Sequence, residues 1–538
     1  MTTAETPGAA TAPAAPPVPA RPAPRTLTIG GTAYPLFLPS IRDPRLHVAA
    51  VIITVHVLGQ VGLGFWVSVP QILAAILTCA ILEVAITFRQ TRTFVWPASA
   101  MLTGSGVALI LRVVGTPPGE PWSTYAWYVF AVVAGLSLLS KYVIKYKGTH
   151  VFNPSNIGLV VAFLVLGSSR VEPLDFWWAP LNVWMLAAYA VITIGGLLIT
   201  RRLRLLALAA AFWVTFAIGL GILAASGHSM VARWSFAPVT GLDYWRVIVT
   251  SPEVLIFLFF MITDPKTTPA GQVGRVAFGM LVAIVSVLLM APQTDEFGSK
   301  VALLSGLVVV CAARPLLDRL VPEPKTAADN LRLFLGRLGL RAPLRAGVAA
   351  VVVLAIGAGI VVAGTPARGF VAVGSDEILG RLPNQVDPGT LPAVTIDDGV
   401  TDYIAGGGIQ EVVVTLAQNL EFENQALLRR DSSILAAVDH GDRLLEMQNR
   451  LASTTTSATT TVVHYRFDTI HASLLIPFGK QDGFSLGLES TGTKVEETYG
   501  ARGVLEARVE SPFSLTFAVR RATGDRWLNV AVLPAPPG

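Results

Sequence analysis

Charged residues are scarce in this chain. Only 14% of its 538 residues are Asp, Glu, Lys or Arg, whereas soluble globular domains contain about 25%. The mean hydropathy is +0.59. This composition argues against an ordinary soluble protein and predicts an integral membrane protein, with the lipid bilayer as its partner. The net charge of +5 does not predict binding to nucleic acid, because the basic residues lie between apolar runs, where they set membrane topology.

Cysteine is nearly absent too. Cys79 and Cys311 both lie inside apolar runs, so the chain offers neither a disulfide framework nor a cluster for iron–sulfur ligation. The histidines show no ligand spacing, and we expect no metal site. The chain also contains no P-loop, dinucleotide fingerprint or nucleophile elbow. If the protein takes part in an enzymatic reaction, we expect it to do so as one subunit of an oxidoreductase, and its catalytic residues are unassigned.

The N-terminus lacks the pattern of a signal peptide. Its first residues are rich in Ala, Pro and Thr, without a basic start that leads directly into an apolar stretch. We predict a disordered cytoplasmic tail over residues 1–40.

Eleven apolar segments follow this tail. Basic residues follow each even-numbered segment through the tenth, and acidic residues such as Glu120 and Asp295 lie in the opposite loops. The positive-inside rule then places the N-terminus in the cytoplasm of a protein of the cell membrane. The third, fifth, eighth and tenth segments are shorter than the roughly 20 residues that span a bilayer. The segments cover approximately residues 46–66, 71–88, 97–113, 124–144, 154–168, 180–199, 205–225, 252–262, 274–291, 300–317 and 346–364.

The C-terminal third has a different character. Residues 321–345 read as a basic interfacial segment and residues 346–364 as an extra transmembrane helix, so residues 366–538 should lie outside the cell. Within them, Ile409–Leu416 has strand composition, Asn419–Leu451 has helical periodicity with a break near His440, and six runs of strand character follow. This order predicts an α+β domain and resembles the cone-shaped fold of nuclear-transport-factor-2-like domains.

Two proline-interrupted segments stand out, residues 150–158 and 261–269. Asn153 is placed to cap a helix that has Pro154 at its first position. A helix that begins inside a membrane presents unpaired N–H groups and a partial positive charge, which suit an anionic or electron-rich ligand. Six polar residues near such helix starts are the tentative cofactor or substrate site: Thr103, Asn153, Ser155, Asn156, Thr263 and Asp264.

Segments three and five are short, and so are segments eight and ten, which follow five crossings later. An odd offset of five crossings gives two repeats of opposite orientation, so the fold expected for residues 41–320 is mainly α. It is a ten-helix inverted repeat of five plus five helices, with broken helices. Ten ordinary helices without symmetry are the alternative.

Several motifs carry a family resemblance: Ala98–Gly104, Lys147–Pro154, Phe260–Pro265, Lys300–Leu304 and Arg314–Asp318. The motifs resemble the RnfD/NqrB-like family, whose members are membrane proteins of the Rnf electron-transport complex and of the sodium-pumping NADH:quinone oxidoreductase. The resemblance implies ten helices in inverted repeats, a bound flavin, partner redox subunits, and transmembrane electron transport coupled to ion movement. The subgroup suggested is the branch found with enediyne biosynthesis.

One departure concerns the flavin. Family members attach flavin mononucleotide to the Thr of a Ser-Gly-Ala-Thr motif, and no such motif occurs in segments one to ten. This absence argues against covalent flavin and leaves noncovalent flavin mononucleotide or riboflavin as the expected cofactor.

Three functions therefore stay open. The first is a flavin-binding redox subunit, the second a transporter or channel for a small or hydrophobic solute. The third is a membrane anchor for an outer binding domain.

Overall fold

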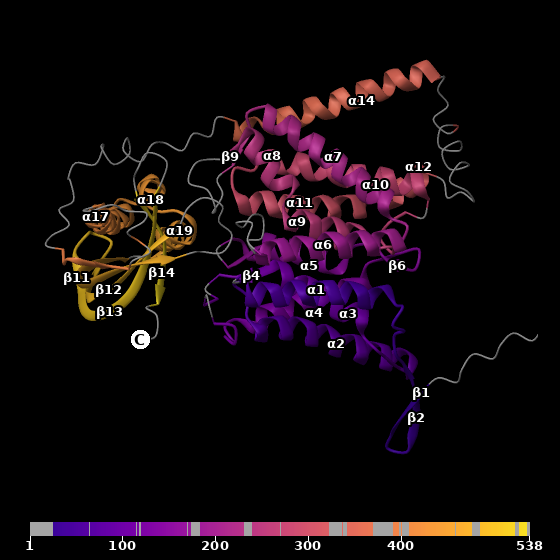
Figure 1. Cartoon of the computed structure of the whole chain (residues 1–538), viewed down its shortest axis with the longest axis horizontal. Helices are drawn as coiled ribbons and strands as arrows, with labels where there is room; N and C mark the ends of the chain where they lie inside the picture. The colour runs from indigo at the N-terminus through magenta and orange to yellow at the C-terminus, as the bar shows by residue number, and fades with distance from the viewer. Residues whose placement is uncertain are drawn as a thin grey trace, which may run out of the picture.

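The computed structural model describes most of the chain (Figure 1). The described residues are 25–321, 336 and 342–534, except positions 64, 115, 118–119, 169, 174–182, 231–238, 270, 369–390, 398–399, 401–407, 458, 476–484 and 522–526. Most of the predicted basic segment 321–345 therefore lies outside the described residues.

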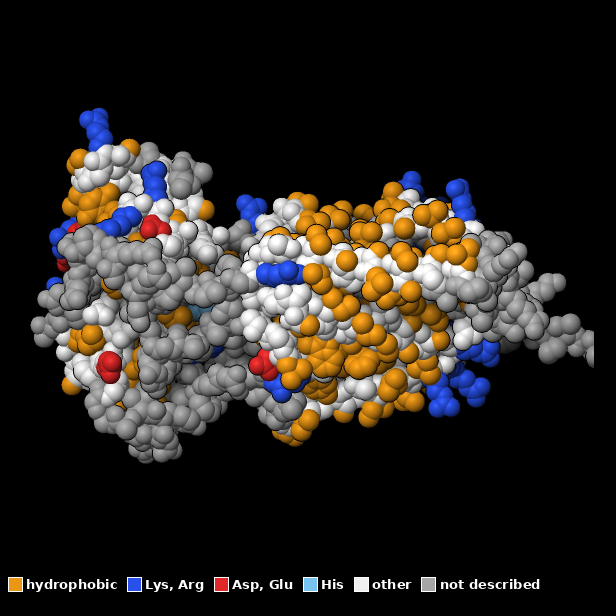
Figure 2. Space-filling view, turned by 90° about the horizontal axis from the view of Figure 1, so that it is seen from above, with side chains coloured by type: hydrophobic (Ala, Val, Ile, Leu, Met, Phe, Trp, Pro, Cys, Tyr) orange, Lys and Arg blue, Asp and Glu red, His pale blue; other side chains and the backbone are white. Residues whose placement is uncertain are grey.

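A bundle of roughly aligned helices forms the larger part of the molecule (Figure 1). Apolar side chains cover the side of the bundle shown in Figure 2, as expected for a surface against lipid. The helices are α1 Pro44–Val61, α2 Val69–Thr91, α3 Ala98–Ile110, α4 Trp127–Val143, α5 Pro154–Leu166, α6 Val183–Arg202, α7 Leu206–Ala225, α8 Gly241–Val249, α9 Pro252–Ile256, the π-helix η1 Phe257–Ile262, α10 Gln272–Met290, α11 Glu296–Ala312, α12 Arg314–Leu320 and α14 Ala342–Ala363.

Each of the eleven predicted apolar segments contains a helix. Among the described residues, six helices are long and apolar enough to cross a membrane, and α11 with α12, bent by 55°, makes a possible seventh. The helices α3, α4, α5 and residues 347–363 are apolar but shorter than a full span. The prediction of a mainly helical protein is confirmed, and its apolar helices are compatible with an integral membrane protein. Ten crossings in an inverted repeat stay a prediction.

Two helix pairs run antiparallel through the bundle. A Cβ added at Gly195 of α6 would lie 2.5 Å from Val51 of α1, and one added at Gly62, just after α1, would lie 2.2 Å from Trp184 of α6. In the second pair, Asn156 near the start of α5 donates to the Leu304 carbonyl of α11. Near the other end of α5, Phe163 meets Phe297 edge to face. Small residues let these helices approach closely.

Short strands border the bundle. The pairs are β4 Leu111–Val113 with β7 Val171–Pro173, β5 Lys145–Tyr146 with β6 Thr149–His150, and β8 Ser229–Met230 with β9 Val239–Thr240.

The predicted disordered tail needs a correction. Residues 1–24 lie outside the described residues, but β1 Arg25–Ile29 and β2 Thr32–Phe37 form a hairpin, and β3 Phe94–Val95 adds to it as a third strand. The reason is local: Gly30 and Gly31 both adopt positive φ, as a two-residue hairpin turn requires, between runs of alternating polar and apolar residues.

Three helices and a five-stranded sheet form the C-terminal region (Figure 1). The strand order is β10-β11-β12-β13-β14, antiparallel except for β10 beside β11. The helix break near His440 is confirmed. The likeness to the nuclear-transport-factor-2-like fold stays a prediction. The elements are α17 Gly408–Arg429, α18 Ser432–Val438, α19 Gly441–Thr456, β10 Val394–Ile396, β11 Thr460–Leu475, β12 Ser485–Tyr499, β13 Leu505–Arg521 and β14 Trp527–Pro534.

The predicted strand at Ile409–Leu416 was wrong, because these residues are the first turns of α17. The β-branched Val run favoured a strand. However, Ile409, Val412, Val413 and Leu416 recur at helical spacing, and all four are buried in the core against the sheet.

The contact between α4 and α5 gives a stability prediction. A Cβ added at Gly158 would lie 1.7 Å from Ser137 Oγ, whereas one added at Gly135 would meet only ordinary van der Waals contacts. We expect Gly158→Ala to lower the free energy of unfolding by about 1–3 kcal/mol through overpacking. Thermal unfolding of the purified protein in detergent measures this. Gly135→Ala is the control, and Ser137→Gly in the same chain should restore part of the loss; an unchanged Gly158→Ala variant would contradict the packing.

Candidate functional site

The start of α5 is a polar cap buried in the bundle. Asn153 has extended backbone, and Pro154 occupies the first helical position, where no N–H is needed. Asn153 Oδ1 accepts from the Asn156 backbone N–H at 3.2 Å and from the Ser155 hydroxyl at 2.8 Å. All four residues, Asn153 to Asn156, are buried. The sequence pattern that predicted a cap here is thus matched in geometry.

A second break lies at the end of η1. This segment is a π-helix, a geometry that often marks functional sites, and it stops at the Thr263-Asp264-Pro265 sequence. The Thr263 hydroxyl donates to the Phe259 carbonyl at 2.5 Å, and Asp264 Oδ1 accepts from the Lys266 backbone N–H at 3.0 Å.

The two breaks meet, although more than a hundred residues separate them. Asn153 Nδ2 donates to the Met261 carbonyl at 3.3 Å. His150 Nε2 lies 3.1 Å from Asp264 Oδ2. Five of the six predicted site residues therefore belong to one region, which we call the α5–η1 junction: Asn153, Ser155, Asn156, Thr263 and Asp264.

Asn156 gives this junction an acceptor with no donor. Its Nδ2 donates to the Leu304 carbonyl of α11 at 3.0 Å, which sets the orientation of the amide. Its Oδ1 is buried and accepts no hydrogen bond from any described residue. A buried acceptor without a donor costs free energy unless a ligand or water supplies one. Asn156 is therefore the residue of the junction that is best placed to hold a ligand.

Thr103 is not joined to this junction by a hydrogen bond. Its hydroxyl donates to the Ser99 carbonyl within α3. The approach of α3 to α5 is one turn further on, where a Cβ added at Gly106 would lie 3.1 Å from Ser155 Oγ.

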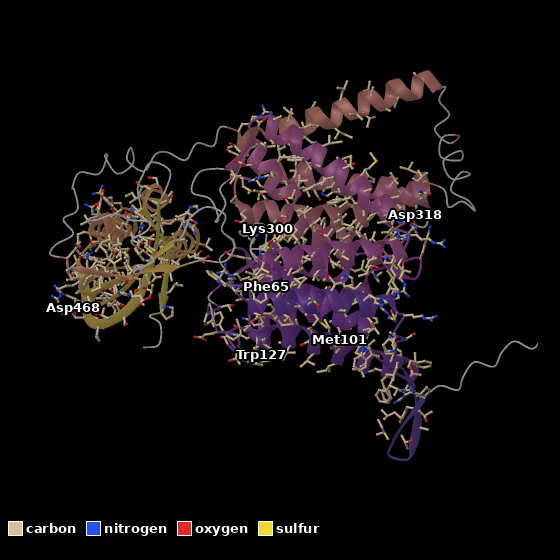
Figure 3. All side chains as sticks on the ribbon, viewed as in Figure 1. Phe65, Met101, Trp127, Lys300, Asp318 and Asp468 are labelled. Carbon is tan, nitrogen blue, oxygen red and sulfur yellow. The ribbon has the colours of Figure 1, made fainter. Side chains whose placement is uncertain are left out.

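Charged side chains gather at the end of the bundle that carries α12, where Figure 3 labels Asp318. Lys147 lies 3.3 Å from Asp318, and Arg314 donates to the Lys266 carbonyl at 2.7 Å. The Lys266 side chain is exposed. The rim beside the junction is thus rich in cations, which attract an anionic group.

A buried ionic cluster that sequence reasoning missed lies toward the opposite end, where Figure 3 labels Lys300. Lys300 Nζ is 2.6 Å from Glu296 and 3.1 Å from Glu253, and its side chain is only 4% exposed. The four-residue spacing of Glu296 and Lys300 was the available signal; the approach of α9 was not visible in the sequence.

One arginine connects the bundle to the C-terminal region. Arg112 of β4 lies 3.4 Å from Glu172 in the bundle and 3.5 Å from Asp442 of α19, and its guanidinium lies 3.9 Å from the centre of the Trp66 ring. Cation–π stacking and two carboxylates together hold a buried positive charge.

The C-terminal region contains its own buried charges. Arg443 donates to both carboxylate oxygens of Glu423, and Asn529 donates to Glu423 at 2.9 Å. Burial favours a raised pKa for Glu423, but the charge and hydrogen bonds of Arg443 outweigh it and lower that pKa. Burial and then the charge of Glu423 raise the pKa of Asp439 well above its ordinary value. Burial beside Glu423 therefore favours the neutral, protonated form of Asp439 over its carboxylate.

No known family model matches the chain. No curated protein matches it either. The resemblance to the Rnf and sodium-pump subunits thus stays a prediction that rests on the motifs quoted above.

The capping of α5 can be tested at Asn153. Asn153→Ala removes both the cap and the bond to Met261, and we expect a loss of about 2 kcal/mol in unfolding free energy. Asn153→Ser keeps a capping oxygen but is too short to reach Met261, so it should lose about half as much. Thermal unfolding in detergent compares them, and equal losses would show that the cap contributes nothing.

The raised pKa of Asp439 predicts a pH dependence of stability. A folded-state pKa above the unfolded value stabilises the fold at low pH, and this stability is lost as pH rises through the folded pKa. As pH rises above the ordinary carboxyl pKa of about 4, Asp439→Asn should lose less stability than the parent chain, by up to about 1.4 kcal/mol per pH unit. Hydrogen exchange of the α19 and β14 amides, corrected for intrinsic rates, measures this. Asp468→Asn, at an exposed site, is the control; a parallel pH profile for Asp439→Asn would refute the prediction.

Proposed function

We propose that the chain is an integral membrane subunit of an electron-transfer assembly, similar in role to the Rnf and sodium-pump subunits that it resembles. In this proposal it binds a flavin without a covalent bond at the α5–η1 junction. The observation that carries the proposal is the buried Asn156 Oδ1 in the first turn of α5. This oxygen accepts no hydrogen bond from any described residue.

The packing of the bundle supports the inverted repeat within this proposal. α1 with α6 and α5 with α11 are each antiparallel, as equivalent helices of two inverted halves have to be. The caps also correspond: Asn153 Oδ1 accepts from the N–H three residues later, and Asp295 Oδ1 does the same at the start of α11. The repeat would pair the junction with the region of Lys300.

The residues of the junction fit a flavin in two respects. A flavin ring carries an N–H group that could donate a hydrogen bond to Asn156 Oδ1. The exposed Lys266 on the rim could attract the phosphate of flavin mononucleotide. When bound, the flavin would supply one-electron and two-electron transfer. Asn153 would hold the start of α5 against η1, and the His150–Asp264 pair would hold the two breaks in place.

The proposed setting is the cell membrane, with the N-terminus in the cytoplasm and the C-terminal region outside. The basic residues near α12 support this orientation, because positive charge favours the cytoplasmic side. Electrons would have to come from partner redox subunits, since no cysteine cluster or nucleotide motif occurs in the sequence. A role in natural-product biosynthesis of the enediyne type belongs to the same proposal.

A second candidate function is transport of an ion or a small solute. The Lys300 cluster favours it, because ionisable groups buried among apolar helices are costly and commonly mark ion or substrate pathways.

The flavin is tested with the full-length protein purified in detergent from flavin-replete cells. We expect a yellow protein with flavin at about stoichiometric level, released by acid because no covalent bond holds it. Asn156→Leu removes the acceptor and should lower the flavin content at least about tenfold, an effect of roughly 1.4 kcal/mol or more in binding. Flavin absorbance and fluorescence after acid precipitation measure both.

The matched control is Ser305→Ala, since the Ser305 hydroxyl donates within its own helix next to Leu304. It should keep its flavin. A colourless parent protein would overturn the proposal and favour transport. Flavin that stays with the precipitated protein would show covalent attachment, which contradicts the noncovalent site.

A further inference from the structure

The N-terminal hairpin is fixed to the end of one membrane helix by aromatic contacts. The Tyr34 ring of β2 lies 5.3 Å from Phe88 in the last turns of α2 and 5.9 Å from Phe94 of β3, and these two rings are 4.8 Å apart. Such tilted and edge-on arrangements are favourable for aromatic rings. The hairpin therefore has a defined position relative to the bundle.

The pleat of the hairpin separates its residues into two faces. Leu27 pairs with Tyr34 across the strands, and Ile29 is two residues further along β1, so both share the face of Tyr34. Thr26 and Thr28 alternate onto the other face. Apart from Arg25 and Thr32, the face that packs on α2 is thus apolar. The opposite face is polar on β1 and carries Ala33, Pro35 and Phe37 on β2.

Part of this apolar face remains uncovered. Leu27 is 40% exposed and Ile29 is 50% exposed. In Figure 1 the hairpin extends past α2, which is the lowest helix in that view, and runs across the direction of the helix axes. The hairpin therefore lies beyond the edge of the bundle, next to the end of α2, where lipid would surround the protein.

Cations surround the same place. Arg25 begins β1, and Arg89 and Arg92 end α2, with the Arg92 guanidinium 5.5 Å from the centre of the Phe88 ring. Trp96, just after β3, is 47% exposed. Apolar residues flanked by arginines and an exposed tryptophan are characteristic of protein at the boundary between headgroups and acyl chains.

We propose that the β1–β2 hairpin binds the anionic lipid leaflet beside α2, with Leu27 and Ile29 facing the acyl boundary and the nearby arginines facing lipid phosphates. The continuity of this face with the lipid-exposed side of α2, where Leu77 and Ile81 are exposed, favours lipid over a protein partner. This inference does not depend on the flavin proposal.

Nitroxide labels can test the proposal in the full chain. Ile29→Cys and Thr28→Cys place labels on opposite faces of one strand, while the native Cys79 and Cys311 are buried and protected from labelling. The proteins are placed in lipid nanodiscs of phosphatidylcholine and phosphatidylglycerol. We expect the Ile29 label to relax faster with oxygen than with a water-soluble nickel complex, and the Thr28 label to show the reverse preference.

Two results would overturn the proposal. Equal access of the nickel complex to both labels would place the whole hairpin in water. Protection of the Ile29 label from both oxygen and nickel would indicate a protein contact, such as a second copy pairing with β1, which pairs only with β2 among the described residues.

Discussion

A helix that begins inside an apolar bundle has to find partners for its first N–H groups, and the α5–η1 junction depends on this constraint. The side chain of Asn153 satisfies this constraint at α5, because its oxygen accepts a hydrogen bond from a backbone N–H of the first turn. Its nitrogen donates to the Met261 carbonyl in η1. Because both functions use the same amide, the position of η1 is coupled to the start of α5. The packing of α11 follows, since Asn156 of the same turn binds Leu304.

Local patterns in the sequence predicted much of this arrangement. The cap at Asn153 and the helix break near His440 follow from residue types at fixed spacing, and the apolar segments follow from hydropathy. Three-dimensional proximity does not follow from such patterns. Nothing near Asp264 in the sequence indicates that its partner is His150, and nothing near Lys300 indicates Glu253.

The errors also have a physical origin. Val412 and Val413 favour a strand by composition. They nevertheless lie in α17, because apolar residues at helical spacing are buried there against the sheet. The N-terminal hairpin was missed because the composition of the first residues dominated the interpretation. Two adjacent glycines and a short alternating run were sufficient for a turn once Tyr34 could pack on Phe88. In α17 tertiary contact outweighed local preference, whereas in the hairpin a local turn signal and a tertiary contact agreed.

The attachment of the C-terminal region has a mechanical consequence. The chain enters it from α14, which packs on α7 and α10, and Ala367 just beyond α14 accepts a hydrogen bond from Ser229. The ionic contact through Arg112, in contrast, belongs to the α1–α5 half of the bundle. The C-terminal region is thus connected through the chain to one half of the bundle and through an ionic contact to the other half. A displacement of Arg112 relative to α19 would break the ionic contact with Asp442, so this contact is where motion of the α1–α5 helices would reach the C-terminal region.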